Sequence, residues 1–285
     1  MVRPLVMGVL NVTPDSFSDG GRYFDLEPAL ARGLEMTAEG ADVIDVGGES
    51  SRPGAQPVPE AEELRRVIPV IEALARHVRV SVDTTKPAVA EAALSAGATL
   101  LNDISASLWP VAASNGVGWV ALHMSGTPRT MQDDPHYDDV VGEVHGFLIE
   151  RARRAVDAGV PEVWVDPGIG FGKTARHNLT LLHHLPALAA SGFPVLVGTS
   201  RKGFLGLLAA GPGEERAPVA KRLPGSIATA TWAMLAGAAM VRVHDVAAAS
   251  QSATLVGSTR LIPDVAPRAA RMSLEAVGGP ELGVR

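Results

Sequence analysis

The hydrophobic and polar positions of the chain repeat one arrangement: a helical stretch ends at a small residue and a glycine, and a short apolar run follows. Six segments show it, at residues 39–47, 95–103, 114–123, 157–166, 190–198 and 235–244. Two further apolar runs, at residues 4–11 and 78–85, raise the number of expected strands to eight. None of these runs alternates cleanly, which is typical of parallel strands that are buried on both faces.

Helices are expected between these strands, at residues 27–40, 60–76, 87–96, 138–159, 178–191 and 225–237. The glycines that close the repeats are expected to cap helices in the left-handed conformation: Gly40, Gly97, Gly116, Gly159, Gly192 and Gly237. No Pro- or Ser-rich linker divides the 285 residues. The alternation predicts a single (β/α)8 TIM barrel over residues 1–285, with a core at about 5–262 and a C-terminal tail at about 263–285. An open doubly wound sheet is the alternative, which eight strands disfavour.

Composition narrows the possible functions. The net charge of −6 shows no basic field for nucleic acid or an anionic membrane, and the absence of cysteine excludes disulfides, a thiolate nucleophile and sulfur-bound zinc. The longest nearly apolar stretch, at residues 227–241, is shorter than the ~20 residues of a membrane span. We therefore expect a cytoplasmic protein without a membrane anchor. Among only four lysines, we expect Lys86 and Lys221 to lie at the surface.

Polar side chains gather where the expected strands end, at Asn11, Glu49, Asp83, Asn102, Asp103, His123, Asp166, Ser200, Arg201, Lys202, Arg242 and His244. The carboxyl ends of all strands meet at one mouth of a parallel barrel, where such enzymes hold their active sites. We therefore expect an active site at this mouth.

The last two strands end in cationic segments, GTSRKGFLG and MVRVHDV. Because loops after the seventh and eighth strands of barrels commonly bind anions, these segments predict a phosphate or pyrophosphate site. The middle strands end in the acceptors Asp83, Asn102 and Asp166. These could hold metal ions, sugar hydroxyls or the amide edge of a nitrogen heterocycle; metal chelation by these three alone is disfavoured because divalent metals need denser clusters.

Three loops carry further candidates. The segment DPGIGFGKT imitates a phosphate-binding P-loop, but its spacing is one residue short and position 167 is proline, so it is better interpreted as a loop that brings Phe171 and Lys173 to a ligand. Long polar loops follow the first two strands, at residues 11–25 and 47–60, and could act as lids or be ordinary solvated loops.

Eight motifs together carry a resemblance. In chain order they are NVTPDSFSDGG, DVGGESSRPGA, SVDT, NDIS, HMSGTPRTMQ, DPGIGFGKT, GTSRKGFLG and RVHDV. The chain resembles the dihydropteroate synthase family of bacterial folate synthesis from about Met7 to Val246. The resemblance implies a homodimeric barrel, a transferase that joins 4-aminobenzoate to 6-hydroxymethyl-7,8-dihydropterin diphosphate. It implies 7,8-dihydropteroate and pyrophosphate as products, and makes the chain a sulfonamide target.

The resemblance also implies roles for individual residues. Asp83, Asn102, Asp166 and Lys202 would hold the pterin, and Arg242 and His244 the diphosphate, with Ser51 at both substrates and Asn11 as the protein ligand of Mg2+. The 4-aminobenzoate pocket and its loops would use Asp19, Ser51, Arg52, Pro53, Phe171 and Gly203. Asp83, Lys202, Arg242 and His244 would be the catalytic residues of a dissociative, SN1-like reaction.

Two positions depart from the family pattern. Gly203 stands where relatives often have serine, so a backbone N–H would serve the 4-aminobenzoate carboxylate, and the segment 105–117 is short, which leaves its helix open. Two rival functions remain: a methyltetrahydrofolate methyltransferase, which would not need the SRK segment or the SSRPG loop, and a catalytically silent pterin-binding paralogue, which would have lost a site residue.

Overall fold

The computed structural model describes residues 3–13, 26–52 and 54–259 of the chain. Its sheet has the order β6-β5-β4-β3-β2-β1-β8-β7, and all paired strands are parallel. A parallel bridge between Val165 and Val195 joins the two outer strands and closes the barrel. The strands are β1 (Leu5–Asn11), β2 (Val43–Gly47), β3 (Arg79–Asp83), β4 (Leu100–Asp103), β5 (Gly118–Leu122), β6 (Glu162–Asp166), β7 (Leu196–Val197) and β8 (Met240–Val243).

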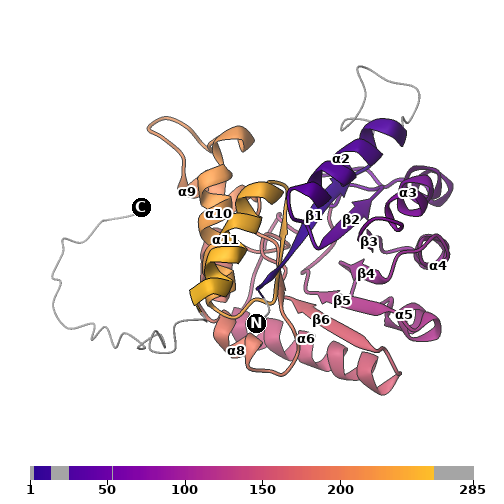
Figure 1. Cartoon of the computed structure of the whole chain (residues 1–285). Coiled ribbons are helices and arrows are strands. Elements are labelled where there is room, and N and C mark those ends of the chain that lie inside the picture. Colours follow the sequence, from indigo (N-terminus) through magenta and orange to yellow (C-terminus); the bar gives the residue numbers. More distant parts are fainter. Residues whose placement is uncertain (1–2, 14–25, 53, 260–285) are drawn as a thin grey trace, which may run out of the picture.

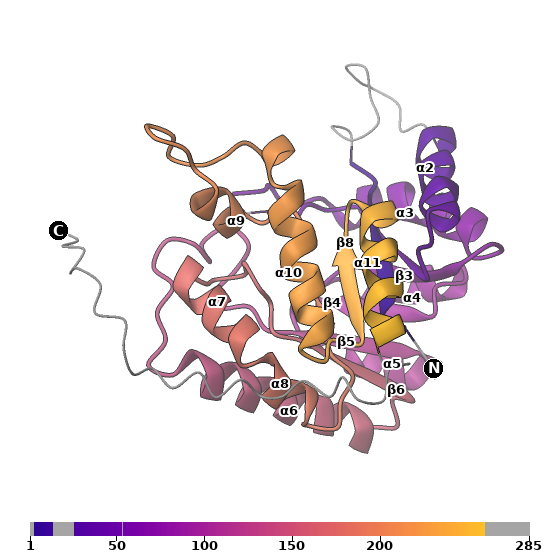
Figure 2. The same cartoon turned by 60° about the vertical axis from the view of Figure 1, so that its left-hand side comes forward.

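Helices surround this barrel (Figures 1 and 2). They are α2 (Leu26–Ala38), α3 (Glu60–Leu74), α4 (Pro87–Ser95), α5 (Trp109–Asn115), α6 (Val140–Asp157), α7 (Ala175–His183), α8 (Leu185–Ala189), α9 (Gly203–Leu208), α10 (Leu223–Leu235) and α11 (Val246–Thr259), with a 3-10 turn at Val219–Lys221. The predicted (β/α)8 barrel is confirmed. The extent of a single domain over residues 1–285 stays a prediction.

Most of the expected helices are present within a few residues of their predicted ends. All six predicted cap glycines have positive φ, from +63° at Gly116 to +111° at Gly97. The expected helix at 178–191 is instead two helices, α7 and α8, because Pro186 has no N–H to donate to the Leu182 carbonyl and therefore interrupts the helical hydrogen bonds. The short segment after β4 does form a helix, α5, and α11 was not predicted.

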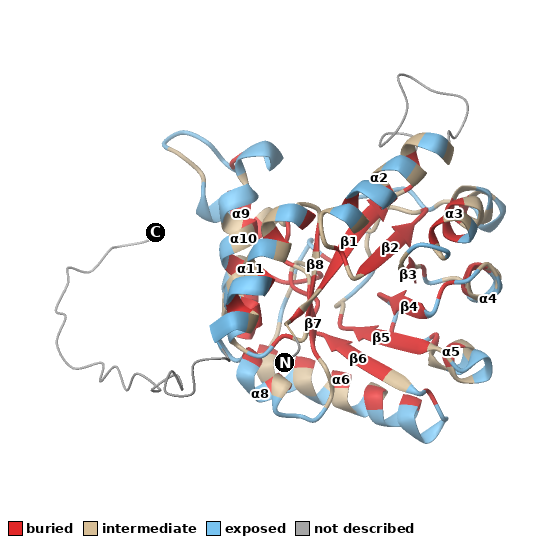
Figure 3. Ribbon diagram, viewed as in Figure 1, coloured by how far each residue is buried: buried red, intermediate tan, exposed pale blue. Residues whose placement is uncertain are grey.

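Strand side chains point alternately into the barrel and outward to the helices, so the protein has two apolar cores. Seven strands each direct one apolar residue into the barrel interior, at Met7, Val43, Leu100, Val120, Trp164, Leu196 and Met240. The residues between these point outward and pack under the helices, as Val82, Leu101 and Trp119 do. Figure 3 shows the result: the strands are buried along most of their length, and the helices are buried on their inward faces. This packing fixes the direction in which each strand's end presents its side chains.

Charged residues at the strand beginnings pair with one another. Arg79 Nη2 lies 2.5 Å from Glu162 Oε2, and the Trp164 indole donates to Glu162 Oε1 at 2.7 Å. Arg3 contacts Asp42 in the same way, at 2.9 Å. These charges therefore close the amino end of the barrel and are available for no chemistry at the opposite mouth.

Some predictions fall outside the described residues. Asp19 and Pro53, both expected near 4-aminobenzoate, lie there, as do most of the long loop after β1 and the C-terminal tail. In the ranges that are described, no helix is both long enough and apolar enough to cross a membrane.

Candidate active site

The period of the strands places a polar layer above the apolar one. Two residues beyond Val43, Leu100, Trp164 and Met240 along their strands are Asp45, Asn102, Asp166 and Arg242. Side chains two apart on a strand share a face, so these four also point into the barrel, closer to its carboxyl mouth. Asp83 belongs to the same layer because it pairs in register with Asn102. The sequence therefore concentrates charge at a buried level of the mouth.

Arg242 lies between two carboxylates of this layer. Its Nε donates to Asp45 Oδ2 at 2.6 Å, and its Nη2 donates to Asp83 Oδ2 at 2.7 Å. Asp45 is fully buried, and the side chains of Arg242 and Asp83 are partly buried, with 19% and 13% of their surface exposed. The guanidinium thus links β8 with β2 and β3. We did not predict Asp45 from the sequence; its signal is a lone acid within the otherwise apolar strand VIDVG.

Two acceptor atoms in the layer have no hydrogen-bond partner among the described residues. The Asn102 amide donates to Asp45 Oδ2 at 2.8 Å, which fixes its orientation. Asn102 Oδ1 and Asp45 Oδ1 are both buried and unpartnered. Because buried acceptors are costly to leave unsatisfied, this pair marks a position where a ligand with N–H donors would gain most.

Burial dominates the ionisation of the carboxyl groups. It raises the pKa of Asp83 to about 7, with Asp45 and Glu63 adding to the effect and Arg242 opposing it. Burial likewise raises the pKa of Asp166 to about 6. The Gly168 N–H, which donates to Asp166 Oδ1 at 2.7 Å, acts in the opposite direction and lowers this pKa. Both groups therefore change charge near neutral pH, which is typical of functional sites.

Lys202 approaches the same layer from the loop before α9. Its ammonium donates to the Ile169 carbonyl at 2.7 Å and lies 3.9 Å from the centre of the Phe171 ring. Burial lowers the pKa of Lys202 to about 7, although Asp166 and Asp83 favour its charged form. Lys202 and Phe171 thus form one wall of the mouth.

The glycine-rich loop after β6 packs closely against this wall. A Cβ on Gly170, where φ is +84°, would lie 2.7 Å from Lys202 Cδ, and one on Gly168 would overlap the His123 carbonyl at 1.8 Å. We expected Lys173 to face a ligand at the mouth, but in the structure its side chain turns away from it. Its buried ammonium contacts His123 Nδ1 at 3.0 Å and the carbonyls of His123 and Phe171. Lys173 therefore holds the loop, which explains how Phe171 keeps its place.

Ser200, Arg201 and His244 border the mouth between β7 and β8. Ser200 Oγ lies 3.0 Å from His244 Nδ1. Burial, with Arg242 and Arg201 nearby, lowers the pKa of His244 to about 3, so its ring is neutral at physiological pH. Arg201 has a positive φ of 60° and forms a two-point ion pair with Asp245, at 2.7 and 3.1 Å. This pair fixes the loop that carries Ser200 and Lys202.

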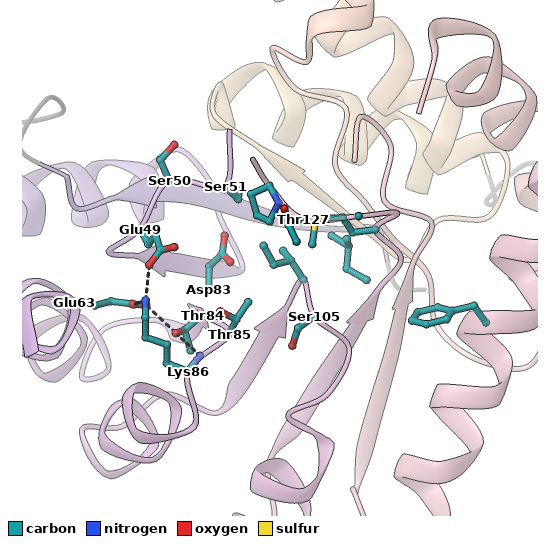
Figure 4. A pocket seen from close by; sticks show the side chains of 16 residues that line it. Glu49, Ser50, Ser51, Glu63, Asp83, Thr84, Thr85, Lys86, Ser105 and Thr127 are labelled. Carbon is teal, nitrogen blue, oxygen red and sulfur yellow. Dashed lines mark hydrogen bonds and ion pairs between the residues drawn. The ribbon is translucent and has the colours of Figure 1, made fainter. Parts of the chain in front are cut away.

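A cavity of about 400 Å3 opens beside Asp83, over the ends of β2 to β5 (Figure 4). Ser51 lines it, whereas Arg52 is exposed at its side. Asn102, Asp166, Lys202 and Arg242 belong to the mouth but not to this lining, and neither does Gly203, the first residue of α9. Of the predicted residues that the structure describes, Asp83, Asn102, Asp166, Lys202 and Arg242 lie together at the mouth, with Asp83 shared by the cavity and the charged layer.

Lys86 differs from the sequence prediction. We expected it at the surface, yet its ammonium pairs with Glu49 and with Glu63, a residue of α3 that is 1% exposed. Lys221, by contrast, is exposed as expected. The sequence offered no local signal for Lys86, because its partners lie 37 and 23 positions away.

The metal-binding capacity of the mouth is modest. Among the described residues, no three His, Asp or Glu side chains come together to hold a metal ion. Asn11 ends β1 at the mouth, half-buried, with no hydrogen bond from its amide to the part of the chain that the structure describes. An amide oxygen can bind Mg2+, and the role of Asn11 as a Mg2+ ligand stays a prediction.

Comparison with known proteins identifies this arrangement. A family model described as pterin binding enzyme matches residues 7–244. The Escherichia coli (strain K12) dihydropteroate synthase is 46% identical over 266 residues, which cover 90% of this chain and 92% of the relative.

Two solved structures are similar in shape as well. A Xanthomonas albilineans dihydropteroate synthase with 4-aminobenzoic acid has a TM-score of 0.83 and 48% identity, and covers 92% of this chain and 94% of its own. A structure from the same organism with 7,8-dihydropteroate has a TM-score of 0.79 and 44% identity, and covers 92% and 95%. The chain therefore belongs to the pterin-binding enzymes and, within them, to the dihydropteroate synthase family, whose members transfer an alkyl group. The resemblance in the motifs is confirmed.

The buried carboxyl group of Asp166 gives a prediction on stability. Because its pKa is about 6 in the fold and about 4 in an unfolded chain, the fold loses stability as pH rises between these values. We expect Asp166→Asn to raise the free energy of unfolding by roughly 2–3 kcal/mol at pH 8 and to leave it unchanged below pH 4. Urea unfolding at both pH values measures this, with Asp157→Asn on the exposed end of α6 as the control. An equal effect at the two pH values would contradict it.

Proposed function

We propose that the chain joins 4-aminobenzoate to 6-hydroxymethyl-7,8-dihydropterin diphosphate and releases 7,8-dihydropteroate and pyrophosphate. The observation that supports this most is the buried layer itself, in which acidic and amide acceptors stand next to Lys202 and Arg242. The pterin is a flat heterocycle whose edge carries an amino group and a ring N–H beside a carbonyl. Such an edge needs acceptors and a donor in one plane.

Asp83, Asn102, Asp166 and Lys202 would bind that edge. Asn102 Oδ1 accepts no hydrogen bond from the described residues. The Gly168 N–H donates to only one carboxylate oxygen of Asp166, so the other can accept from the pterin. Lys202 would donate to the pterin carbonyl or ring nitrogen. Phe171, beneath the Lys202 ammonium, would provide an apolar surface against the substrates.

Arg242 and His244 would bind the diphosphate. Arg242 uses two of its five N–H groups on Asp45 and Asp83, which leaves three for phosphate oxygens. His244 is neutral, so it would contribute one N–H donor while its Nδ1 accepts from Ser200. Asn11 would hold Mg2+, which neutralises diphosphate charge when bound.

We propose a dissociative reaction at this site. The C–O bond to the diphosphate breaks first, and the electron pair leaves with pyrophosphate while Arg242 and His244 stabilise its growing charge. The remaining pterin methylene cation is delocalised, and the carboxylate of Asp83 stabilises it. The 4-aminobenzoate amine then attacks the methylene carbon and loses a proton.

The second substrate would lie toward the loops. Ser51, Arg52, Phe171 and the backbone N–H of Gly203 would shape its pocket, together with Asp19 and Pro53, all of them proposed from the resemblance. Two alternatives, a methyltetrahydrofolate methyltransferase and a silent pterin-binding paralogue, fit less well. The former would need neither the Lys202 segment nor the Ser51 loop, and the latter would have lost one of these groups.

The assembly proposed is a homodimer in the cytoplasm, without nucleic acid or membrane partners. α10 and α11 lie side by side (Figure 2), and both carry exposed apolar side chains, among them Leu235 and Leu255. Such a face needs cover, and a second copy would supply it. Analytical ultracentrifugation of the purified chain is expected to show a dimer; a monomer at micromolar concentration would contradict this, and cell fractionation checks the location.

The proposed reaction is tested by pyrophosphate release. We expect steady release only with the pterin diphosphate, 4-aminobenzoate and Mg2+ together, and formation of dihydropteroate in equal amount. With the pterin diphosphate alone, positional-isotope exchange of the diphosphate oxygens is expected, because the cation forms and collapses reversibly. Absence of dihydropteroate would refute the function, whereas product without isotope exchange would refute only the dissociative path.

Asp83→Asn tests the role of the charge. The amide keeps the size of the side chain but removes the charge that stabilises the cation, so the barrier is expected to rise by about 2–4 kcal/mol, or roughly 30- to 900-fold in kcat. Steady-state kinetics measures it, with Asp157→Asn as the matched control. Turnover equal to that of the unmodified chain would show that Asp83 does not act on the cation.

A further inference from the structure

We propose that Glu49 and Lys86 form a clamp that positions the loop between β2 and α3, residues 48–52 and 54–59, and thereby sets the affinity for the second substrate. The inference rests on the proposed function, which assigns Ser51 and Arg52 to 4-aminobenzoate. Glu49 and Lys86 would be positioning residues, since they act on the substrate only through this loop.

The clamp is centred on the Lys86 ammonium. It reaches from the start of α4 to pair with Glu49 at the base of the loop and with Glu63 on α3 (Figure 4). Burial by itself would lower the pKa of Lys86, but hydrogen bonds to Glu49 and Glu63 raise it, so the ammonium is fully charged at neutral pH. Three elements therefore meet at one cation.

Glu49 joins the two ends of the loop. Its Oε2 accepts from the Lys86 ammonium and also from the Val58 backbone N–H, at 3.2 Å. Next to it, Arg66 of α3 donates to the Gly48 carbonyl at 2.8 Å. A Cβ on Gly48 would lie 2.8 Å from Val67 Cγ1, so the backbone sits directly on α3. The loop is thus held at its base, while Arg52 near its tip is exposed.

The same cluster holds the end of β3. The Thr84 hydroxyl donates to Glu63 Oε1 at 2.7 Å and accepts from the Lys86 backbone N–H at 3.2 Å. Thr84 follows Asp83 directly, and both line the cavity with Ser51. The base of the loop and the catalytic end of β3 are therefore fixed to one buried carboxylate, Glu63.

The two ion pairs of Lys86 differ in what their loss would do. Glu63 is almost fully buried, so removal of its partner leaves a buried charge and destabilises the fold. Glu49 is 29% exposed, and the Lys86–Glu63 pair survives its loss. Glu49→Gln therefore weakens the hold on the loop and leaves the rest of the cluster paired. Binding must then order a looser loop, which reduces affinity.

The experiment compares Glu49→Gln with Glu72→Gln, the same change at an exposed position of α3. For Glu49→Gln we expect KM for 4-aminobenzoate to rise about five- to tenfold, with KM for the pterin diphosphate and kcat within twofold. Hydrogen exchange is expected to quicken in peptides covering residues 48–59 but not in α3 or β3. Glu72→Gln is expected to change none of these.

The possible results separate the proposals. An unchanged KM for 4-aminobenzoate, or an equal rise in both KM values with a lower Tm, would overturn the clamp, because the role would then be absent or merely structural. Glu49→Asp, which keeps the charge, is expected to recover part of the affinity. If the unmodified chain makes no dihydropteroate, the proposed function fails; hydrogen exchange still reports on the clamp.

Discussion

The guanidinium of Arg242 is the contact on which the mouth of the barrel depends. It stands between Asp45 and Asp83, two carboxylates on neighbouring strands that would repel each other in a poorly hydrated space. Asp45 in turn orients the Asn102 amide. Loss of the Arg242 charge would leave the carboxylates of Asp45 and Asp83 unpaired. These carboxylates and the Asn102 amide, which come from three strands, would then no longer be held in one geometry. Stability and the proposed ligand recognition therefore depend on the same ion pairs of Arg242.

The charges of the layer are only partly compensated. Burial raises the pKa of Asp83 and Asp166 and lowers that of Lys202, so the pKa values of all three groups lie near neutral pH. Within the part of the chain that the structure describes, Asn102 Oδ1 and Asp45 Oδ1 have no hydrogen-bond partner. The fold thus bears the cost of an arrangement that a heterocycle with N–H donors would relieve, which is how a preorganised site stores binding energy.

Local patterns predicted whatever depends on local physics. The repeated glycine caps and the apolar runs predicted the barrel, because left-handed caps and burial on both faces of a strand can be recognised within a few residues of sequence. The polar residues at the strand ends predicted the position of the charged mouth. Asp45 escaped because it lies within a strand, and Lys86 because its partners are distant in sequence. Lys173 lies in the expected loop, but only tertiary packing decides that its ammonium turns toward His123.

The two halves of the proposed site are held by different physics. The pterin side depends on strand register, in which Asp83 is paired with Asn102 and, through Gly47, with β2. A register shift would turn a whole strand inside out, so this half is nearly invariant in position. The 4-aminobenzoate side depends on loops fixed by side chains such as Glu49 and Arg201. Substitutions there are expected to change affinity for the second substrate by small steps without disturbing the cation chemistry that we propose at Asp83. Selectivity between 4-aminobenzoate and molecules of similar shape is therefore expected to be a property of the loops, and the capacity to form the pterin cation a property of the barrel.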